Sequence, residues 1–202
     1  MIASLCLLVA PACALQSESP SMAASSSPQG SGLPYTFAEF DFVATDVDGF
    51  SDDPDGIAVH GSYAFQPNWF AFGRLEHLGG RAGGSSVDID TLSAGVGYHL
   101  PVAPSTDLVF DLGLSHASTD SSAPGGTADG LGYLVGAGIR HRASDKVELD
   151  VGLDYSDSEH ADGNTALRLG AVYTAAPNLG FTAQLSASDD VDAFQIGVRW
   201  MP

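Results

Sequence analysis

Five aspartates stand within ten residues of one glycine-containing segment: Asp46, Asp48, Asp52, Asp53 and Asp55. Carboxylate oxygens are the ligands that calcium prefers, and glycine permits the tight turn of a calcium-binding loop. The spacing begins like such a loop but lacks the glutamate that completes it at the twelfth position. The segment therefore predicts either a weak calcium site or, as we favour, a solvated acidic loop.

A second acidic cluster surrounds a histidine. His160 stands between Glu159 and Asp162, three residues after Asp157. A hydrolytic site needs a carboxylate–histidine pair and further carboxylates that face the same water molecule. The sequence has no nucleophilic serine between closely spaced glycines and no histidine–cysteine spacing typical of a metal site. We therefore expect no enzymatic activity, no catalytic residue and no cofactor, and keep a hydrolase as the least favoured alternative.

The charge of the chain excludes one large class of partner. The 202 residues include 7 Lys and Arg against 25 Asp and Glu, which gives a formal net charge of −18. A protein that binds nucleic acid needs a basic surface, so we exclude nucleic acid. Charged residues make up only 16% of the chain, compared with roughly 25% in soluble domains. The composition is therefore acidic without being that of an ordinary soluble surface.

Hydrophobic residues alternate with small or charged residues through most of the chain. Between 147 and 155 every odd position is Val, Leu or Tyr, and three of the even positions are carboxylates. A strand places alternate residues on opposite faces, whereas a helix would spread them around its circumference. We predict ten strands, at 35–45, 56–66, 69–77, 87–100, 106–117, 130–142, 146–156, 164–174, 179–187 and 191–201.

The connections between these segments alternate in length. Short turns follow the second, fourth, sixth and eighth segments, and longer polar loops are expected at 46–55, 78–86, 118–129 and 157–163, with a tight one at 188–190. No proline falls within the ten segments, and Pro202 ends the last, as expected because proline removes a ladder hydrogen bond. The pattern predicts a chain of antiparallel hairpins.

The polar face of these segments does not look like solvated surface. Exposed strands commonly carry lysine, but the chain has a single lysine, in a turn. Arginine and carboxylates among glycine, serine and threonine suit a crowded lumen in which guanidinium pairs with carboxylate. We therefore predict a closed, up-and-down antiparallel transmembrane β-barrel in preference to a soluble sandwich. The predicted lumen ion-pair network comprises Arg74, Arg140, Arg142, Arg168, Arg199, Glu39, Asp41, Glu76, Asp111, Glu148, Asp150 and Asp154.

Aromatic residues near the segment ends predict the boundaries of the lipid. A strand of about 10 residues tilted near 40° spans roughly 25 Å, the height of the apolar band of membrane barrels. Aromatic girdles flank that band. The predicted girdle residues are Phe65, Trp69, Tyr98, Tyr173, Phe181 and Trp200 beside the short turns, and Tyr133 and Tyr155 nearer the longer loops.

The first 34 residues predict two segments that precede a barrel at 35–202. Residues 1–14 are apolar and end in Ala12-Cys13-Ala14, which is typical of a cleaved signal peptide. Lipidation at Cys13 stays open as an alternative. Cys6 and Cys13 are the two cysteines of the chain, so cleavage would leave none. Residues 15–34 are rich in Ser, Pro and Gly and predict a flexible segment that does not pack.

Several of these features together resemble the small outer-membrane β-barrel proteins of Gram-negative bacteria. They are the signal peptide, the cysteine-free mature chain, Phe40 and Phe42 in the first strand, the acidic Asp-Gly loop and the last strand Phe194–Trp200. The build is similar to OmpA- and OmpX-type barrels, and most similar to xanthomonad-type surface and vesicle barrels. The last strand resembles the assembly signal of such proteins, but Met201-Pro202 follows its aromatic end. The resemblance implies localisation in the outer membrane, outer-membrane lipid as a partner and insertion by the barrel-assembly machinery.

Three functions remain open. The favoured one is a structural surface barrel whose lumen is largely filled by arginine–carboxylate pairs, with acidic extracellular loops available for contacts. The others are a narrow passive pore for small solutes and a hydrolase at the rim. A ten-stranded lumen is only slightly wider than the side-chain-filled lumen of an eight-stranded barrel. Long arginine and glutamate side chains favour closure, whereas inward glycine and serine favour some water.

Overall fold

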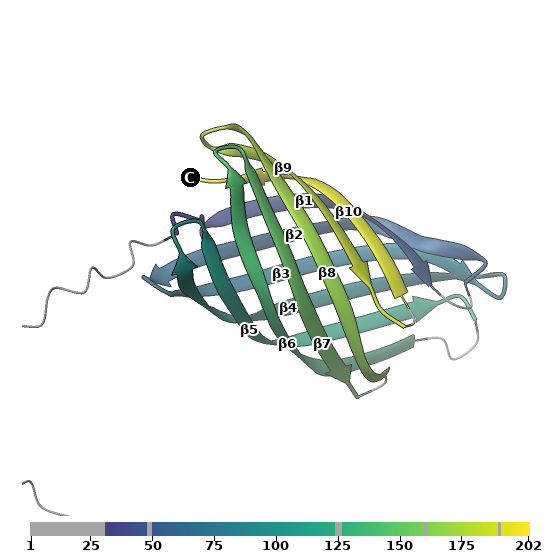
Figure 1. The fold of residues 1–202 in the computed structure, drawn as a ribbon. Helices are drawn as coiled ribbons and strands as arrows, with labels where there is room; N and C mark the ends of the chain where they lie inside the picture. The colour runs from purple at the N-terminus through teal and green to yellow at the C-terminus, as the bar shows by residue number, and fades with distance from the viewer. Residues whose placement is uncertain (1–30, 48–49, 124–126, 160, 190) are drawn as a thin grey trace, which may run out of the picture.

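The computed structural model describes residues 31–47, 50–123, 127–159, 161–189 and 191–202, which form ten β-strands closed into one barrel (Figure 1). The strands are β1 (Phe37–Val47), β2 (Asp52–Gln66), β3 (Trp69–Ala82), β4 (Ser85–Ala103), β5 (Thr106–Ser121), β6 (Thr127–Ser144), β7 (Val147–Ser158), β8 (Ala161–Ala176), β9 (Leu179–Ala187) and β10 (Val191–Trp200). The described residues contain no helix long and apolar enough to cross a membrane. The predicted closed antiparallel barrel is confirmed.

Each strand pairs antiparallel with its sequence neighbours, and β1 also pairs with β10 to close the sheet. This seam runs from the pair Ala38–Trp200 to the pair Val47–Val191. Among the described strands none is therefore left with a free edge. Closure matters in lipid because the hydrocarbon offers no hydrogen-bond partner to an unpaired backbone group.

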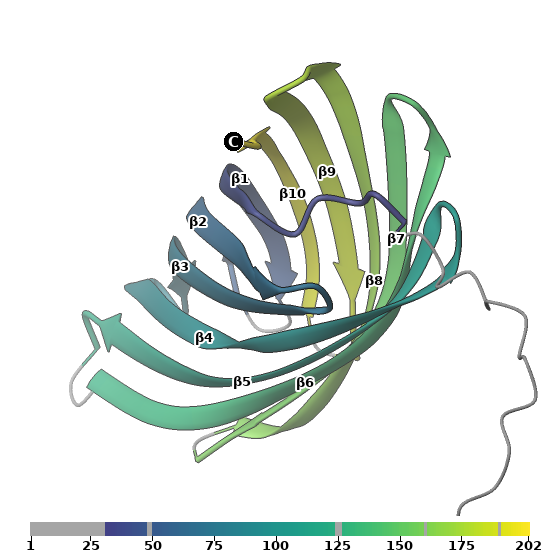
Figure 2. The same ribbon diagram turned by 90° about the vertical axis from the view of Figure 1, so that its left-hand side faces the viewer.

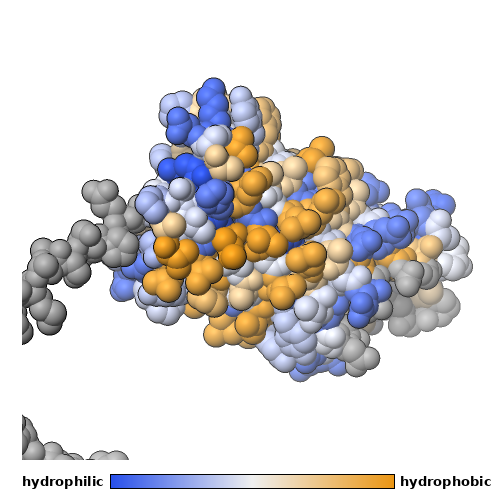
Figure 3. Space-filling view, viewed as in Figure 1, coloured by the Kyte–Doolittle hydropathy of each residue, from blue (hydrophilic) through white to orange (hydrophobic). Residues whose placement is uncertain are grey.

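The alternating pattern places the apolar residues on the outside. Leu114 is 70% exposed and Phe40 53%, while their strand neighbours Ser115 and Glu39 are only partly exposed on the inner wall. On the face seen in Figure 3, hydrophobic side chains form a band across the strands, and hydrophilic residues gather toward the two ends. This arrangement is the inverse of a soluble protein and fits a lipid-facing wall.

The hairpins at the end away from the termini contain less loop than the sequence predicts. β3 continues to Ala82 and β4 begins at Ser85, so a two-residue turn of Gly83 and Gly84 replaces the loop predicted at 78–86. Both glycines have positive φ, 58° and 85°, as tight hairpin turns require. β5 and β6 likewise extend into 118–129. The prediction fails because polar side chains mark the end of the lipid band, whereas the backbone ladder continues beyond it.

Two prolines lie inside strands, contrary to the expectation that all would fall outside. Pro54 belongs to β2 and Pro101 to β4. Each stands at an irregularity of the ladder, between Asp52 and Asp55 for the first and between Pro101 and Ala103 for the second. A local shift of register accommodates the missing N–H.

An ordered segment precedes β1 and enters the barrel. We call Ser31–Thr36 the N-terminal strap; Figure 2 shows it in purple, running from the start of β1 across the barrel toward β7. Leu33 and Tyr35 of the strap are buried against Phe70 and Val109 of the inner wall. The sequence placed the start of order at Tyr35, but packing begins a few residues earlier. The predicted signal peptide and most of the predicted flexible segment lie outside the described residues.

Candidate functional site

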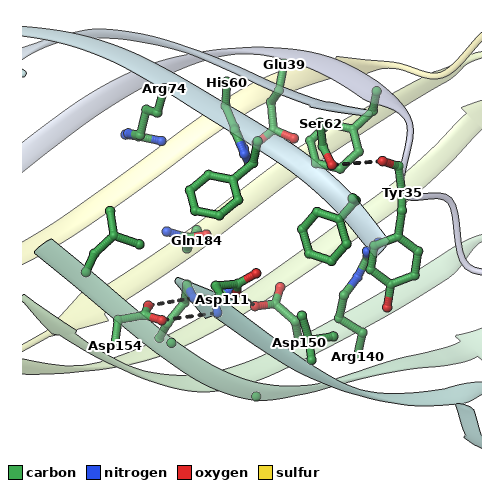
Figure 4. A pocket seen from close by; sticks show the side chains of 18 of the residues that line it. Tyr35, Glu39, His60, Ser62, Arg74, Asp111, Arg140, Asp150, Asp154 and Gln184 are labelled. Carbon is green, nitrogen blue, oxygen red and sulfur yellow. Dashed lines mark hydrogen bonds and ion pairs between the residues drawn. The ribbon is translucent and has the colours of Figure 1, made fainter. Parts of the chain in front are cut away.

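The lumen carries a layer of arginine–carboxylate pairs, some of which are drawn in Figure 4. Arg199 Nε lies 2.5 Å from Glu39 Oε2, across the closing seam. Arg168 of β8 contacts two carboxylates of β7, Asp154 at 2.8 Å and Asp150 at 3.0 Å. Such charge-assisted pairs tie neighbouring strands together inside the barrel.

Two further pairs complete this layer. Arg140 Nε donates to Glu148 Oε1 at 2.7 Å, between β6 and β7. Arg74 and Glu76 pair within β3, with Arg74 Nε 3.2 Å from Glu76 Oε2, and Arg74 Nη2 also donates to the Gln195 amide oxygen at 3.1 Å. Of the nine ionic side chains in these pairs, all except that of Asp154 are at most 24% exposed.

The remaining three residues of the predicted network have other surroundings. Arg142 donates to the Gly32 carbonyl oxygen of the strap instead of pairing with a carboxylate. Asp41 is buried and accepts a hydrogen bond from Thr182. Asp111 lines the central cavity. All twelve predicted residues therefore stand at inward positions of their strands, but the pairing involves only nine of them.

Glycines make room for these charges, a feature that the sequence did not reveal. Gly197 is the cross-strand partner of Asp41, Gly170 that of Asp150, and Gly97 that of Asp111. A Cβ at any of the three would collide with the carboxylate that lies over it. The inward glycines thus allow charged side chains to lie flat against the wall, rather than leaving open space for water.

A hydrogen-bonded cluster holds the strap at the end of the barrel where the C-terminus lies. The Tyr35 hydroxyl donates to Asp107 Oδ2 at 2.8 Å, and His99 Nδ1 lies 3.0 Å from the same oxygen. The rings of Tyr35 and His99 stack with centroids 3.9 Å apart. Burial raises the pKa of Tyr35 above its ordinary value, so the hydroxyl stays protonated as a donor. Sequence reasoning missed this cluster, although strand alternation places both His99 and Asp107 inward.

Apolar side chains also fill part of the lumen. Besides the strap cluster, Val43, Ala58 and Leu78 form a second buried cluster with Ile89 packed against it. A cavity of about 340 Å³ lies between the ionic layer and two aromatic residues, Tyr35 of the strap and Phe37 of β1 (Figure 4). The lumen is therefore only partly polar, which the prediction of an ion-pair lining did not anticipate.

The predicted girdle residues lie on the outer wall. Trp69 and Tyr98 contact each other edge to face with centroids 5.0 Å apart, near the short turns. Tyr133 and Tyr155 lie 6.0 Å apart near the other end, and the Tyr133 hydroxyl donates to Asp157. The other members, Phe65, Tyr173, Phe181 and Trp200, are exposed.

The acidic segments hold no metal cluster within the described ranges. No group of three His, Cys, Asp or Glu residues there could hold an ion. Asp53 instead accepts a hydrogen bond from the Val47 amide. Asp48 of the calcium candidate and His160 of the hydrolase candidate lie outside the described residues, so both ideas stay hypotheses.

The comparisons with known proteins decide the family. The family model of the outer membrane protein beta-barrel domain matches residues 2–201. The chain belongs to this family. Its place is therefore the outer membrane, as the resemblance implied, while the xanthomonad-type likeness stays a prediction. A search among curated proteins found no match.

Solved structures of similar build include two porins and a surface protein. The KdgM porin is 10% identical with a TM-score of 0.45, covering 81% of this chain and 99% of the porin. The NanC porin is 9% identical with a TM-score of 0.48, covering 81% and 100%. Neisserial surface protein A is 12% identical with a TM-score of 0.45, covering 83% and 96%.

Proposed function

We propose that this protein is a non-catalytic surface barrel whose lumen is closed to solutes and whose acidic hairpins are available for contacts outside the cell. The observation that carries the proposal is the strap, which crosses the barrel at one end, above a cavity lined by the ion pairs. In this view the barrel is a scaffold held in the membrane rather than a passage through it.

The strap is fixed by contacts along its whole length. The carbonyl oxygen of Gly32 accepts a hydrogen bond from Arg142 of β6, and that of Pro34 accepts one from Arg140 of the same strand. The carbonyl oxygen of Tyr35 accepts from Ser62 at 2.8 Å, and the guanidinium of Arg140 lies 4.4 Å from the centre of the Tyr35 ring. Buried apolar packing and satisfied hydrogen bonds favour a fixed plug over a loose tail.

The ion-pair layer adds a second barrier behind the strap. Turning an arginine toward lipid would cost about 2–4 kcal/mol at the midplane, so these side chains have to point inward. Unpaired charges in a narrow lumen would lose hydration, and pairing compensates for that loss. The hydrogen bond from Arg74 of β3 to Gln195 of β10 joins strands that are not adjacent, and it narrows the lumen there.

The cavity of about 340 Å³ supports a second candidate, a narrow passive pore. In that case solutes would pass through water beside the arginines. Conductance in planar bilayers separates the two functions. We expect the wild-type protein to show no steady conductance, and Asp150→Ala to raise it because Arg168 loses one of its two carboxylates. Asp129→Ala, at the outer rim, serves as a matched control and should change nothing.

The opposite result would favour the pore. A wild-type protein that conducts steadily, with a conductance that Asp150→Ala leaves unchanged, would mean that the ion pairs do not block the lumen. The barrel would then function in passive transport, and the strap would be a fixed part of the channel wall.

Export and assembly belong to the same proposal. Residues 1–14 would direct export and be removed, and the barrel-assembly machinery would insert the chain into outer-membrane lipid. Mass spectrometry of the protein purified from outer membranes tests this step. An unmodified N-terminus at Leu15 is the expected result, and a lipid on Cys13 would support the alternative.

A further inference from the structure

Asp41 is a buried carboxylate that forms no ion pair with any of the described residues. Only 2% of the surface of this residue is exposed. Oδ1 accepts a hydrogen bond from the Thr182 hydroxyl at 3.2 Å, whereas Oδ2 has no partner among the described residues. The arginines of the inner layer are engaged with other carboxylates. An isolated buried charge is costly, so something has to compensate it.

The side chains of Asp41 and Asp150 approach β9 from opposite sides. Asp41 of β1 lies across Gly197 of β10, and Asp150 of β7 lies across Gly170 of β8. Between them a cavity of about 20 Å³ opens over Thr182 and Gln184 of β9. Such a volume is enough for one particle of the size of a water molecule.

The charges around this cavity leave one negative charge uncompensated. Of its three carboxylates, Glu39 is paired with Arg199 and Asp150 with Arg168. Asp41 alone has no ionic partner within the described part of the chain. One singly charged cation would neutralise it, whereas a divalent ion would leave an excess.

We propose that this cavity binds one monovalent alkali-metal cation. The Asp41 carboxylate supplies the charge, and the Thr182 hydroxyl and Gln184 amide supply neutral oxygen ligands, the type that hard cations prefer. The ion fastens β1 to β9 across the closing strand β10. The site lies on the inner face of the wall, beside the central cavity, whose lining also includes Glu39, Asp150 and Gln184.

Stability in different salts tests the proposal. The full-length protein is folded into lipid vesicles and unfolded in urea at constant ionic strength, with either sodium chloride or choline chloride. Choline is too large for the cavity. At sodium ten times its dissociation constant, the ratio of folded to unfolded protein should be about 11-fold higher than in choline. The difference should saturate with sodium concentration.

Two variants locate the effect. Asp41→Asn keeps the shape of the side chain and should abolish the difference between sodium and choline. Asp111→Asn, which removes another inward carboxylate that faces a different cavity, should retain it. Equal stability of the wild type in both salts would overturn the proposal and indicate that Asp41 is neutralised by a proton. A sodium effect that survives in Asp41→Asn would also overturn it.

A direct observation covers the case in which Asp41→Asn fails to fold. Crystals of the wild-type protein soaked in rubidium chloride should show an anomalous peak between Asp41 and β9. Absence of a peak there, at a rubidium concentration that protects the protein from urea, would place the ion elsewhere and refute the site.

Discussion

Glycine residues determine where the charges inside this barrel can lie. Gly197 faces Asp41 across the closing seam, and a Cβ at this position would also collide with the Phe40 carbonyl oxygen. We therefore expect Gly197→Ala to lower the free energy of unfolding by about 1–3 kcal/mol, as overpacking does. Urea unfolding in vesicles, followed by gel mobility, measures the change.

Gly61 of β2, two strands away from β10 in the barrel order, offers a matched control. A Cβ there would meet nothing within 4 Å. Gly61→Ala should raise the stability by about 0.4–1 kcal/mol, because alanine restricts the unfolded chain more than glycine does. Equal effects of the two substitutions would mean that glycine serves only strand flexibility, and that the fit between glycine and carboxylate has no energetic role.

Much of the site was predictable at the scale of the residue, and the limits are physical. Alternation alone places Arg199 and Glu39 inward. It cannot choose partners, because pairing depends on strand register. Arg74 pairs within its own strand, and Arg142 contacts a strap that composition assigned to flexible chain. From the sequence, the inward glycines predict room for water in the lumen. The carboxylates that occupy this room belong to the paired strands, which the sequence alone does not identify.

The strands themselves show which signals in the sequence are strong. All ten were predicted, because a lipid-facing stripe requires an apolar residue at every second position. Their ends were less predictable, since outside the lipid a ladder needs no apolar residue. Thus β4 and β5 run to Ser85 and Ser121 although polar residues dominate there. The turn Gly83-Gly84 is therefore the end of a hairpin that projects beyond the apolar band.

This hairpin provides a test of orientation. The strap, the C-terminus and the short turns lie at one end of the barrel, and the turn of the β3–β4 hairpin lies at the other (Figure 1). An epitope tag inserted between Gly83 and Gly84 should be recognised by antibody on intact cells. The same tag between Asp145 and Lys146, in the short turn from β6 to β7, should be recognised only after permeabilisation. The reverse pattern would invert the barrel in the membrane and place the strap at the outer mouth.

Closure is the property of the whole molecule on which every other argument rests. An open sheet would leave β1 and β10 with unpaired backbone groups in lipid, at a cost of several kcal/mol for each group. The structure avoids this by pairing the two strands over their whole length, and Arg199–Glu39 adds an ion pair across the same seam.

A disulfide across the seam tests closure directly. Phe42 and Ile196 are cross-strand partners on the outer face, and cross-strand Cβ atoms lie about 4.5–5.5 Å apart, close enough for a disulfide after a small adjustment. The two native cysteines lie within residues 1–14, so a chain without that segment has no competing thiol. The double variant F42C/I196C should therefore crosslink within one chain upon oxidation. Boiled samples should then show a reduction-sensitive shift in gel mobility, because the denatured chain is cyclic.

The control combines the cysteine at position 42 with a cysteine on a strand far from β1. F42C combined with L114C places one thiol on β1 and the other on β5, four strands away in the barrel order, and should give no intramolecular crosslink. Failure of F42C/I196C to crosslink, in protein whose unboiled gel mobility shows that it is folded, would contradict the pairing of β1 with β10. The outward hydrophobic stripe would then belong to an open sheet, and the arginines, the strap and the Asp41 cavity would lose the enclosed lumen that gives them their roles.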